Sequence, residues 1–217
     1  MAWLKDGCVL WLQFDEEKGD VVYDQSGIGN NGVIYGATRV KGKIGGALSF
    51  DGVDDYMKVE SSPSLNLLDR TEMVWLKFSP LAVYNTILSK RPQTDTEGYW
   101  WSYTASSGTR IGWQYADGTK CYSKYWSFDF TDELWHHVAF VKSGETIRCF
   151  IDGIDRGVYN IPNALNEEGY PLFIGRYQGS TYPFSGIIDE VRIYNRALSA
   201  KEIFSHYMYA LTHVKRA

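Results

Sequence analysis

Short apolar runs separated by turn-forming residues restrict this chain to a sheet-rich fold. Valine, isoleucine, tyrosine and tryptophan favour strands, and the 21 glycines and six prolines favour the turns between them. Residues 51–55 (Asp-Gly-Val-Asp-Asp) lie between two such runs and predict a hairpin turn. The runs recur at regular spacing, at residues 7–14, 47–50, 56–59, 71–79, around 87, 99–104, 111–115, 137–141, 147–151, 172–174 and 187–194.

This spacing predicts an all-β chain built as a two-sheet antiparallel sandwich. A length of 217 residues suits one all-β unit, so we expect residues 1–217 to form a single domain. A short helix is expected at the C-terminus, over about residues 199–214, where Ser199 and Glu202 have the spacing of a capping box. Its apolar stripe is expected to pack on the sandwich, with self-association as the alternative, and comprises Ile203, Tyr207, Ala210, Leu211 and Val214.

Net charge and composition argue against several classes of function. The formal net charge of −4, without a long basic run, gives no reason to expect a nucleic-acid partner. Cys8, Cys121 and Cys149 are widely spaced and form no Cys-x-x-Cys motif of a zinc or redox site. No apolar run approaches the ~18 residues of a membrane span, and the first residues do not resemble a signal peptide. The chain as given is expected in the cytosol, but a domain excised from a longer secreted protein would look the same, so its location stays open.

Tryptophan and tyrosine are concentrated between residues 99 and 126. The chain has eight tryptophans and 16 tyrosines, and the run Tyr-Trp-Trp-Ser-Tyr at 99–103 places rings on both faces of any strand. One face can fill the space between two sheets. The other face then needs a ligand, a partner or a covering loop, because rings with an apolar body and a polar tip stack on sugars or bases.

Four further segments follow one another in a distinctive order. They are Leu-Trp-Leu-Gln-Phe-Asp at 10–15 with Tyr-Asp-Gln-Ser-Gly-Ile-Gly-Asn-Asn-Gly at 23–32; Ala-Leu-Ser-Phe-Asp-Gly-Val-Asp-Asp-Tyr at 47–56; Trp-His-His-Val-Ala-Phe-Val at 135–141 leading to Ile-Asp-Gly at 151–153; and Phe-Ser-Gly-Ile-Ile-Asp-Glu-Val-Arg-Ile-Tyr-Asn-Arg-Ala-Leu-Ser at 184–199. With these segments the chain resembles, over about residues 7–204, the laminin-G-like modules of the concanavalin A-like jelly-roll lectin/glucanase superfamily. The resemblance implies a jelly-roll sandwich and a carbohydrate-binding or adhesion module, usually non-catalytic and often attached to a larger secreted enzyme.

We therefore interpret the chain as a non-catalytic, lectin-like module that binds an oligo- or polysaccharide. Rings would stack on the C–H face of the sugar while polar side chains orient it. Trp113 shares a strand face with Ile111 and is the ring most expected to lie in the core. The alternative is a structural, adhesion or surface-assembly protein whose rings meet a protein partner or a second copy. The candidate carbohydrate-binding residues are Trp100, Trp101, Trp113, Tyr122, Trp126, Arg110, Gln114 and Lys124.

A structural calcium ion is a further expectation. Residues 24–31 (Asp-Gln-Ser-Gly-Ile-Gly-Asn-Asn) combine side-chain oxygens with glycines that free carbonyl groups, and calcium prefers such oxygen ligands. The resemblance implies that the strand carrying Asp189 lies near this loop. The expected ligands are Asp24, Asn30 and Asp189, with Asp15 in reserve, and the alternative is an Asx-type turn held by its own hydrogen bonds. The acidic run at 51–55 is expected to serve its turn.

Catalysis is the least supported class of function. A glycosidase needs two carboxylates about 5–9 Å apart, and none of the expected strands carries a suitable pair. A polysaccharide lyase needs a Tyr or His base beside a charge-neutralising group, for which Arg110, Gln114, Tyr122 and Lys124 would be the available residues. The chain also lacks a Gly-x-Ser-x-Gly elbow, a P-loop and a dinucleotide fingerprint. No catalytic residue is therefore expected.

Overall fold

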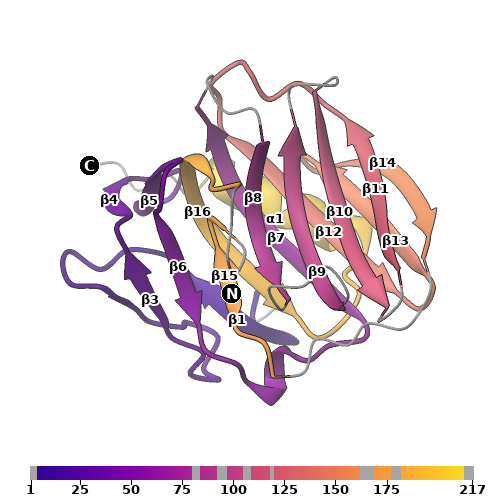
Figure 1. Ribbon diagram of the computed structural model, residues 1–217, viewed down its shortest axis with the longest axis horizontal. Helices are drawn as coiled ribbons and strands as arrows, with labels where there is room; N and C mark the ends of the chain where they lie inside the picture. Colours follow the sequence, from indigo (N-terminus) through magenta and orange to yellow (C-terminus); the bar gives the residue numbers. More distant parts are fainter. Residues whose placement is uncertain are drawn as a thin grey trace.

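Two antiparallel sheets, each of eight strands, stack face to face (Figure 1). The computed structural model describes residues 4–79, 84–91, 97–104, 109–117, 120–161, 169–176 and 182–212. The sheet nearer the viewer in Figure 1, here called the front sheet, has the strand order β11-β10-β9-β8-β15-β6-β3-β2. The back sheet has the order β14-β13-β12-β7-β16-β5-β4, with β1 paired to β16. The predicted two-sheet antiparallel sandwich is confirmed.

The strands follow one another along the chain with short connections. The front sheet comprises β2 (Val21–Val22), β3 (Gly32–Tyr35), β6 (Tyr56–Val59), β8 (Tyr84–Lys90), β9 (Glu97–Thr104), β10 (Arg110–Asp117), β11 (Cys121–Ser127) and β15 (Leu172–Ile174). The back sheet comprises β1 (Cys8–Leu12), β4 (Thr38–Lys41), β5 (Gly46–Asp51), β7 (Arg70–Phe78), β12 (His136–Ser143), β13 (Thr146–Ile151), β14 (Ile154–Asn160) and β16 (Ser185–Tyr194). A 3-10 turn, Pro63–Leu65, precedes β7, and one helix, α1 (Ala200–Thr212), follows β16.

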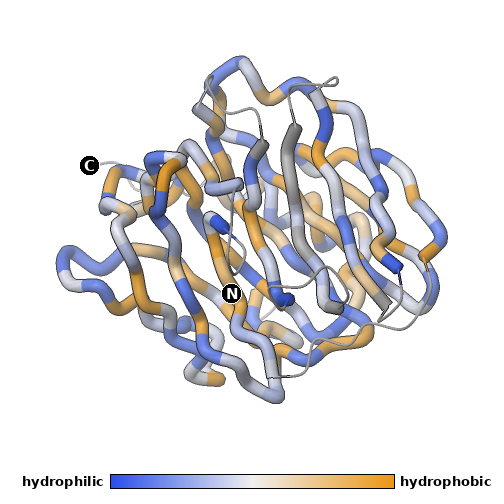
Figure 2. Tube along the Cα trace, in the orientation of Figure 1, coloured by the Kyte–Doolittle hydropathy of each residue, from blue (hydrophilic) through white to orange (hydrophobic). Residues whose placement is uncertain are grey.

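Alternation of side chains along each strand divides the front sheet into an inner and an outer side. Hydrophobic and hydrophilic residues alternate along several of its strands (Figure 2). In β10, the side chains of Ile111, Trp113 and Tyr115 belong to the core between the sheets. Arg110 and Gln114, at the alternate positions, therefore lie on the outer side.

Rings from the aromatic-rich region fill much of this core. Trp101 meets the ring of Phe140 edge-on, with centroids 4.6 Å apart, and so joins the two sheets. Trp113 stacks on Tyr99 at a centroid distance of 5.9 Å. The indole N–H of Trp101 donates to the Oε2 atom of the buried Glu72 at 2.7 Å, which gives this polar group of the core a partner.

A bulge in β16 changes which side its residues face. The pairing with β7 shifts register between Asp189 and Arg192, and Glu190 has a left-handed backbone with φ of 52°. Before the bulge Ile188 points into the core, whereas after it Val191 does. Arg192 consequently lies on the outer side of the back sheet.

Helix α1 covers part of the outer side of the back sheet and lies behind both sheets in Figure 1. Ile203, His206 and Ala210 are its buried residues. Tyr207 stacks on Trp75 of β7 at 5.7 Å, and α1 leaves Trp75 only 3% exposed although the alternation of β7 predicts a wetter position. The predicted packing of the helix on the sandwich is confirmed.

The predicted apolar stripe of the helix is only partly correct. Leu211 is 42% exposed rather than packed. Val214 lies outside the described residues. His206 fills a position of the packed side instead, where its Nδ1 atom lies 2.9 Å from the Arg192 guanidinium. Burial, with Arg192 as the next cause, lowers the pKa of His206 to about 2, so the ring stays neutral.

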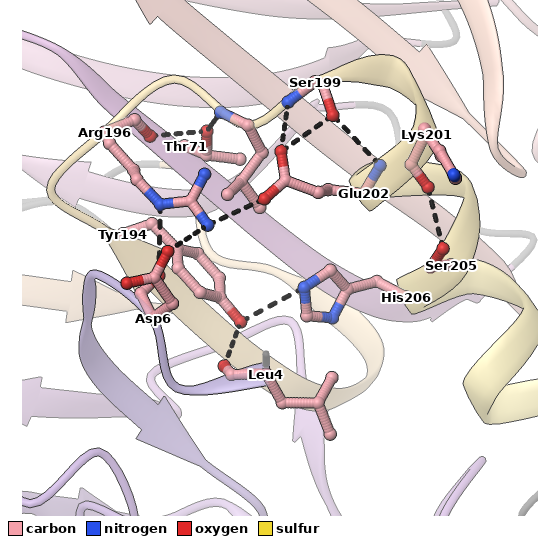
Figure 3. A network of polar contacts seen from close by, with 11 residues as sticks. Leu4, Asp6, Thr71, Tyr194, Arg196, Ser199, Lys201, Glu202, Ser205 and His206 are labelled. Atoms are coloured by element: carbon pink, nitrogen blue, oxygen red, sulfur yellow. Dashed lines mark hydrogen bonds and ion pairs between the residues drawn. The ribbon is translucent and has the colours of Figure 1, made fainter. Parts of the chain in front are cut away.

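The start of α1 has the predicted capping box (Figure 3). Ser199 N–H donates to Glu202 Oε2 at 2.8 Å, and Glu202 N–H donates to Ser199 Oγ at 3.3 Å. Arg196 also pairs with Glu202 at 2.7 Å and with Asp6 at 2.9 Å. The hydrogen bond from Arg196 is the largest cause that lowers the pKa of Glu202 to about 2. In the described part of the chain, no helix combines the length and apolar character needed to cross a membrane.

Candidate functional site

A half-buried tyrosine and two polar side chains form a group on the outer side of the front sheet. Tyr125 of β11 pairs with Gly112 of β10, and a Cβ atom at Gly112 would lie 2.5 Å from carbons of the Tyr125 ring. The absence of a side chain at Gly112 therefore lets this ring lie across β10. The Arg110 guanidinium is 4.1 Å from the ring centroid, and Gln114 Nε2 donates to the Tyr125 hydroxyl at 3.1 Å.

A second group of rings lies on the same side of the sheet. Tyr35 of β3 pairs with Tyr56 of β6, and their rings stack at 4.5 Å with an interplanar angle of 8°. The Arg176 guanidinium lies 3.9 Å from the centroid of Tyr56, and Phe173 of β15 lies 5.9 Å from the same ring. Tyr35 remains 43% exposed, so it offers ring surface to a ligand.

A row of paired residues crosses the sheet between the two groups. From Gln114 the pairing runs to Trp100 of β9, to Ser89 of β8 and to Phe173 of β15. The four strand spacings from β10 to β6 amount to about 19 Å. We call this the outer front surface, although Gln114, Ser89 and Phe173 in its middle are buried. Its members are Arg110, Gly112, Gln114, Tyr125, Ser89, Phe173, Arg176, Tyr56 and Tyr35.

The candidate sugar-binding residues divide between the two sides of the front sheet. Arg110 and Gln114 lie on the outer side. Trp100 pairs with Gln114 along the backbone, and its side chain lies outside the described residues. Because successive residues of a strand alternate, the remaining five candidates face inward and do not join the outer group. They are Trp101, Trp113, Tyr122, Lys124 and Trp126.

The expectation that Trp101 and Trp126 lie outside the core is wrong, whereas that of a buried Trp113 is confirmed. Trp101 and Trp113 are 0% exposed and Trp126 is 5% exposed. Tyr122 is half-buried and stacks on Tyr115 at 4.9 Å, and the Lys124 ammonium lies 5.4 Å from the ring of Tyr159. Trp101 and Trp126 both pack against Phe140 of the back sheet, at centroid distances of 4.6 and 5.3 Å.

Sequence reasoning missed Tyr125, Tyr35, Tyr56 and Arg176. The signal for Tyr125 was present, since alternation from the inward-facing Trp126 places its neighbour outward.

The four residues considered for a lyase site lie on opposite sides of the front sheet. Arg110 and Gln114 face outward while Tyr122 and Lys124 face inward, so these four do not surround one substrate.

Asp24 is occupied by hydrogen bonds within its own loop and the neighbouring strand. Its Oδ1 atom accepts from the backbone N–H groups of Trp11 and Ser26, each at 2.9 Å. Its Oδ2 atom accepts from Ser26 Oγ at 2.7 Å and from the N–H groups of Gly29 and Asn30 at 3.1 and 3.0 Å. These five donors fill the acceptor positions of the carboxylate and favour the Asx-turn alternative.

The other expected calcium ligands also make hydrogen bonds within the protein. The Asn30 amide donates to Val9 O and Ser64 Oγ, both at 2.8 Å, and so helps anchor the loop. Asp189 instead accepts from Ile44 N–H at 2.9 Å, and Asp15 accepts from Gly46 N–H at 2.8 Å. Burial, followed by the neighbouring Glu190, raises the pKa of Asp189 well above its usual value.

The three carboxylates of the hairpin at residues 51–55 lie close together. Asp51, Asp54 and Asp55 have carboxylate oxygens within 4.8 Å of one another. Two of them hold the turn, since Asp55 Oδ2 accepts from Asp51 N–H and Asp51 Oδ1 accepts from Val53 N–H, at 2.9 and 2.8 Å. This agrees with the expected turn role.

Comparison with known families assigns the chain to one of them. A laminin-G-like family model, described as concanavalin A-like lectin/glucanases superfamily, matches residues 51–204. The chain belongs to this superfamily. A comparison with curated proteins finds no relative of the sequence.

Solved structures share the fold at low sequence identity. The binding domain of Paraclostridial Mosquitocidal Protein 1 superposes with a TM-score of 0.74 and 19% identity, covering 94% of this chain and 52% of its own. The chain thus spans about half of that binding domain. Domain 4 of AbnA, a GH43 extracellular arabinanase from Geobacillus stearothermophilus in complex with arabinotriose, has a TM-score of 0.72 and 19% identity, covering 91% of this chain and 97% of its own. The binding domain of botulinum neurotoxin DC in complex with SialylT has a TM-score of 0.74 and 13% identity, covering 95% and 52%.

Proposed function

We propose that the chain is a non-catalytic module that binds an oligo- or polysaccharide across the outer front surface. The observation that carries this proposal is the Tyr125 ring over Gly112, held between Arg110 and Gln114. A half-buried, outward-facing ring with hydrogen-bonding side chains beside it offers the two kinds of contact that a sugar requires.

The arrangement of the surface favours an extended ligand. The two ring groups, Tyr125 and the stacked Tyr35 and Tyr56, are separated by about 19 Å of sheet, which is more than one sugar ring spans. The C–H faces of separate sugar units would stack at the two ends of the surface. Arg110 and Arg176 would donate hydrogen bonds to hydroxyl or carboxylate groups between them.

The comparisons and the geometry support a binding role rather than catalysis. Similar folds occur in binding domains, and one of them holds arabinotriose. The described outward side chains of β6, β10, β11 and β15 include no carboxylate that could serve a glycosidase.

Affinity electrophoresis through gels containing soluble polysaccharides, chosen after a glycan array, tests the proposal. We expect Tyr125→Ala to weaken retention about tenfold, since a lost stack and hydrogen bond together contribute roughly 1.4 kcal/mol. Gly112→Ala is a second variant, because its new Cβ displaces the Tyr125 ring without removing it.

Tyr23→Ala is the matched control, because Tyr23 is 56% exposed in a loop outside the outer front surface. It should migrate like the wild type. Retention that survives both Tyr125→Ala and Gly112→Ala would place the ligand elsewhere, and a wild type that retains no glycan would refute carbohydrate binding.

A protein partner is the second candidate function, favoured by the exposed side of α1. Phe204, Met208 and Leu211 follow the helical spacing and are 49%, 38% and 42% exposed. Such an apolar stripe suits a protein interface. Light scattering after size exclusion would detect self-association through it, and Phe204→Ser should then return the chain to a monomer.

A further inference from the structure

A pocket of about 310 Å³ opens on the back sheet, away from the outer front surface. Ser49, Ile187 and Lys77 lie side by side there, on β5, β16 and β7. Trp75, two residues before Lys77 on the same side of β7, is covered by Tyr207 of α1. The pocket therefore lies next to the part of the back sheet that helix α1 covers.

Several polar side chains at this pocket have no hydrogen-bond or ion-pair partner among the described residues. Lys77, Glu133, Ser49, Ser79 and Ser185 all line it. In the described part of the chain, their ammonium, carboxylate and hydroxyl groups make no hydrogen bond or ion pair. Five polar groups therefore surround one small volume and are all available to a ligand.

Glu133 is held at the pocket by the turn before β12. Its backbone is left-handed, with φ of 56°, a conformation that non-glycine residues rarely adopt. The neighbouring Asp132 fixes this turn, because its Oδ1 atom accepts from Leu134 N–H at 3.0 Å and lies 3.0 Å from His136 Nε2. The carboxylate is thus carried by an ordered turn rather than by a free loop.

We propose that this pocket binds a single sugar residue, free or at the end of a glycan. Each sugar hydroxyl both donates and accepts, which matches a site with a carboxylate acceptor, an ammonium donor and three serine hydroxyls. The presence of one positive and one negative charge disfavours a simple anion or cation, and Ile187 adds apolar contact for ring C–H groups. A volume at the low end of the ~300–1,000 Å³ range of small-molecule sites suits one or two rings rather than a polymer. The pocket is therefore a second sugar site, independent of the outer front surface.

Titration with methyl glycosides of galactose, glucose, mannose, arabinose and N-acetylglucosamine tests this site by two-dimensional amide NMR. We expect at least one glycoside to shift the amide signals of Ser185 and Ile187 in a saturable way. The double variant Lys77→Met/Glu133→Gln should weaken that binding at least tenfold, and Ser49→Phe should abolish it by filling the pocket.

Lys41→Met/Glu17→Gln is the matched control, because both residues are exposed and lie outside the pocket. It should bind like the wild type. Unchanged binding in the Lys77→Met/Glu133→Gln and Ser49→Phe variants, a response to free amino acids in place of glycosides, or no response to any glycoside would overturn the proposal. Polysaccharide retention in the same variants reports on the outer front surface separately, so failure of one site is distinguishable from failure of the other.

Discussion

Trp101 shows how a ring that looks suited to a ligand serves the core instead. It is 0% exposed, contacts Phe140 of the opposite sheet and donates to the buried Glu72. Tyr125 is a smaller ring on β11, two strands away from Trp101 in the same sheet, and faces outward. The function of each ring follows from the side of the strand it occupies and not from its size.

Replacing each of these two rings with alanine should change the free energy of unfolding by different amounts. Trp101→Ala should lower the free energy of unfolding by about 3–5 kcal/mol, as for other large buried rings, and it also removes a donor from Glu72. Tyr125→Ala should lower it by about 1 kcal/mol or less, because the ring lies outside the core. Urea unfolding measures both values. Equal losses would mean that Tyr125 also belongs to the core.

Asp24 provides a second test at this scale. Asp24→Ala removes the acceptor of five hydrogen bonds and should cost about 1.5–3 kcal/mol. The loss should be the same in EDTA and in millimolar calcium, since it arises from the loop's own hydrogen bonds. A loss seen in calcium alone would restore the metal-site interpretation. Thermal melts in the two buffers give the comparison.

At the scale of elements, helix α1 has one side packed on the back sheet and one exposed side, and adjacent residues can belong to different sides. Ile203 is 0% exposed, whereas Phe204 is 49% exposed. Ile203→Ala should therefore destabilise the protein by about 2–5 kcal/mol, while Phe204→Ala should change stability by about 0.5 kcal/mol. Chemical denaturation of the two variants checks this order, and the reverse order would mean that the helix docks by its other side.

The capping box predicts a dependence on pH. The pKa of Glu202 falls from 4.5 to about 2 on folding, so its charged form stabilises the folded state. This stability is fully present above about pH 4.5 and is lost as the pH falls towards 2. Glu202→Gln should remove that part of the acid sensitivity, so that the difference in stability from the wild type narrows from pH 6 to pH 2.5. A constant difference across this range would show that the charge of Glu202 plays no part.

Local sequence signals predicted some elements well and others poorly. The capping box of Ser199 and Glu202 was predictable because its two hydrogen bonds join residues three apart. The bulge at Glu190 was not, because it depends on how β16 pairs with β7 rather than on any residue within β16. The burial of Trp75 likewise depends on α1, which lies far along the chain.

At the scale of the whole molecule, the fold was predictable and the proposed binding surface was not. Alternating runs and four ordered segments were enough for the two-sheet sandwich. The outer front surface brings together Tyr35, Tyr125 and Arg176 through strand pairing, and a sequence without pairing does not place them on one side. The candidate set combined both sides of β10, Arg110 and Gln114 on one and Trp113 on the other, because ring density does not report alternation.

A polysaccharide that binds the folded protein and not the unfolded chain should stabilise the whole fold. A soluble polysaccharide at about a hundred times its dissociation constant should raise the free energy of unfolding by ~2.7 kcal/mol. Gly112→Ala, whose Tyr125 ring is displaced, should gain less at the same concentration. Differential scanning calorimetry with and without polysaccharide measures the gain, and an equal gain in both proteins would argue against the Tyr125 group.

The bulge in β16 also decides how this strand tolerates changes in length. It contributes one extra residue, after which Val191 faces the core and Arg192 and Tyr194 face the side of α1. Deleting Glu190 would remove this extra residue, so Asp189 would still face outward and Val191 would follow it inward in regular alternation. Val191, Arg192 and Tyr194 would keep their present sides. A single-codon deletion at residue 190 would thus preserve the inner and outer sides of the strand, and would remove only the contacts that Glu190 makes with Trp11 and Arg192.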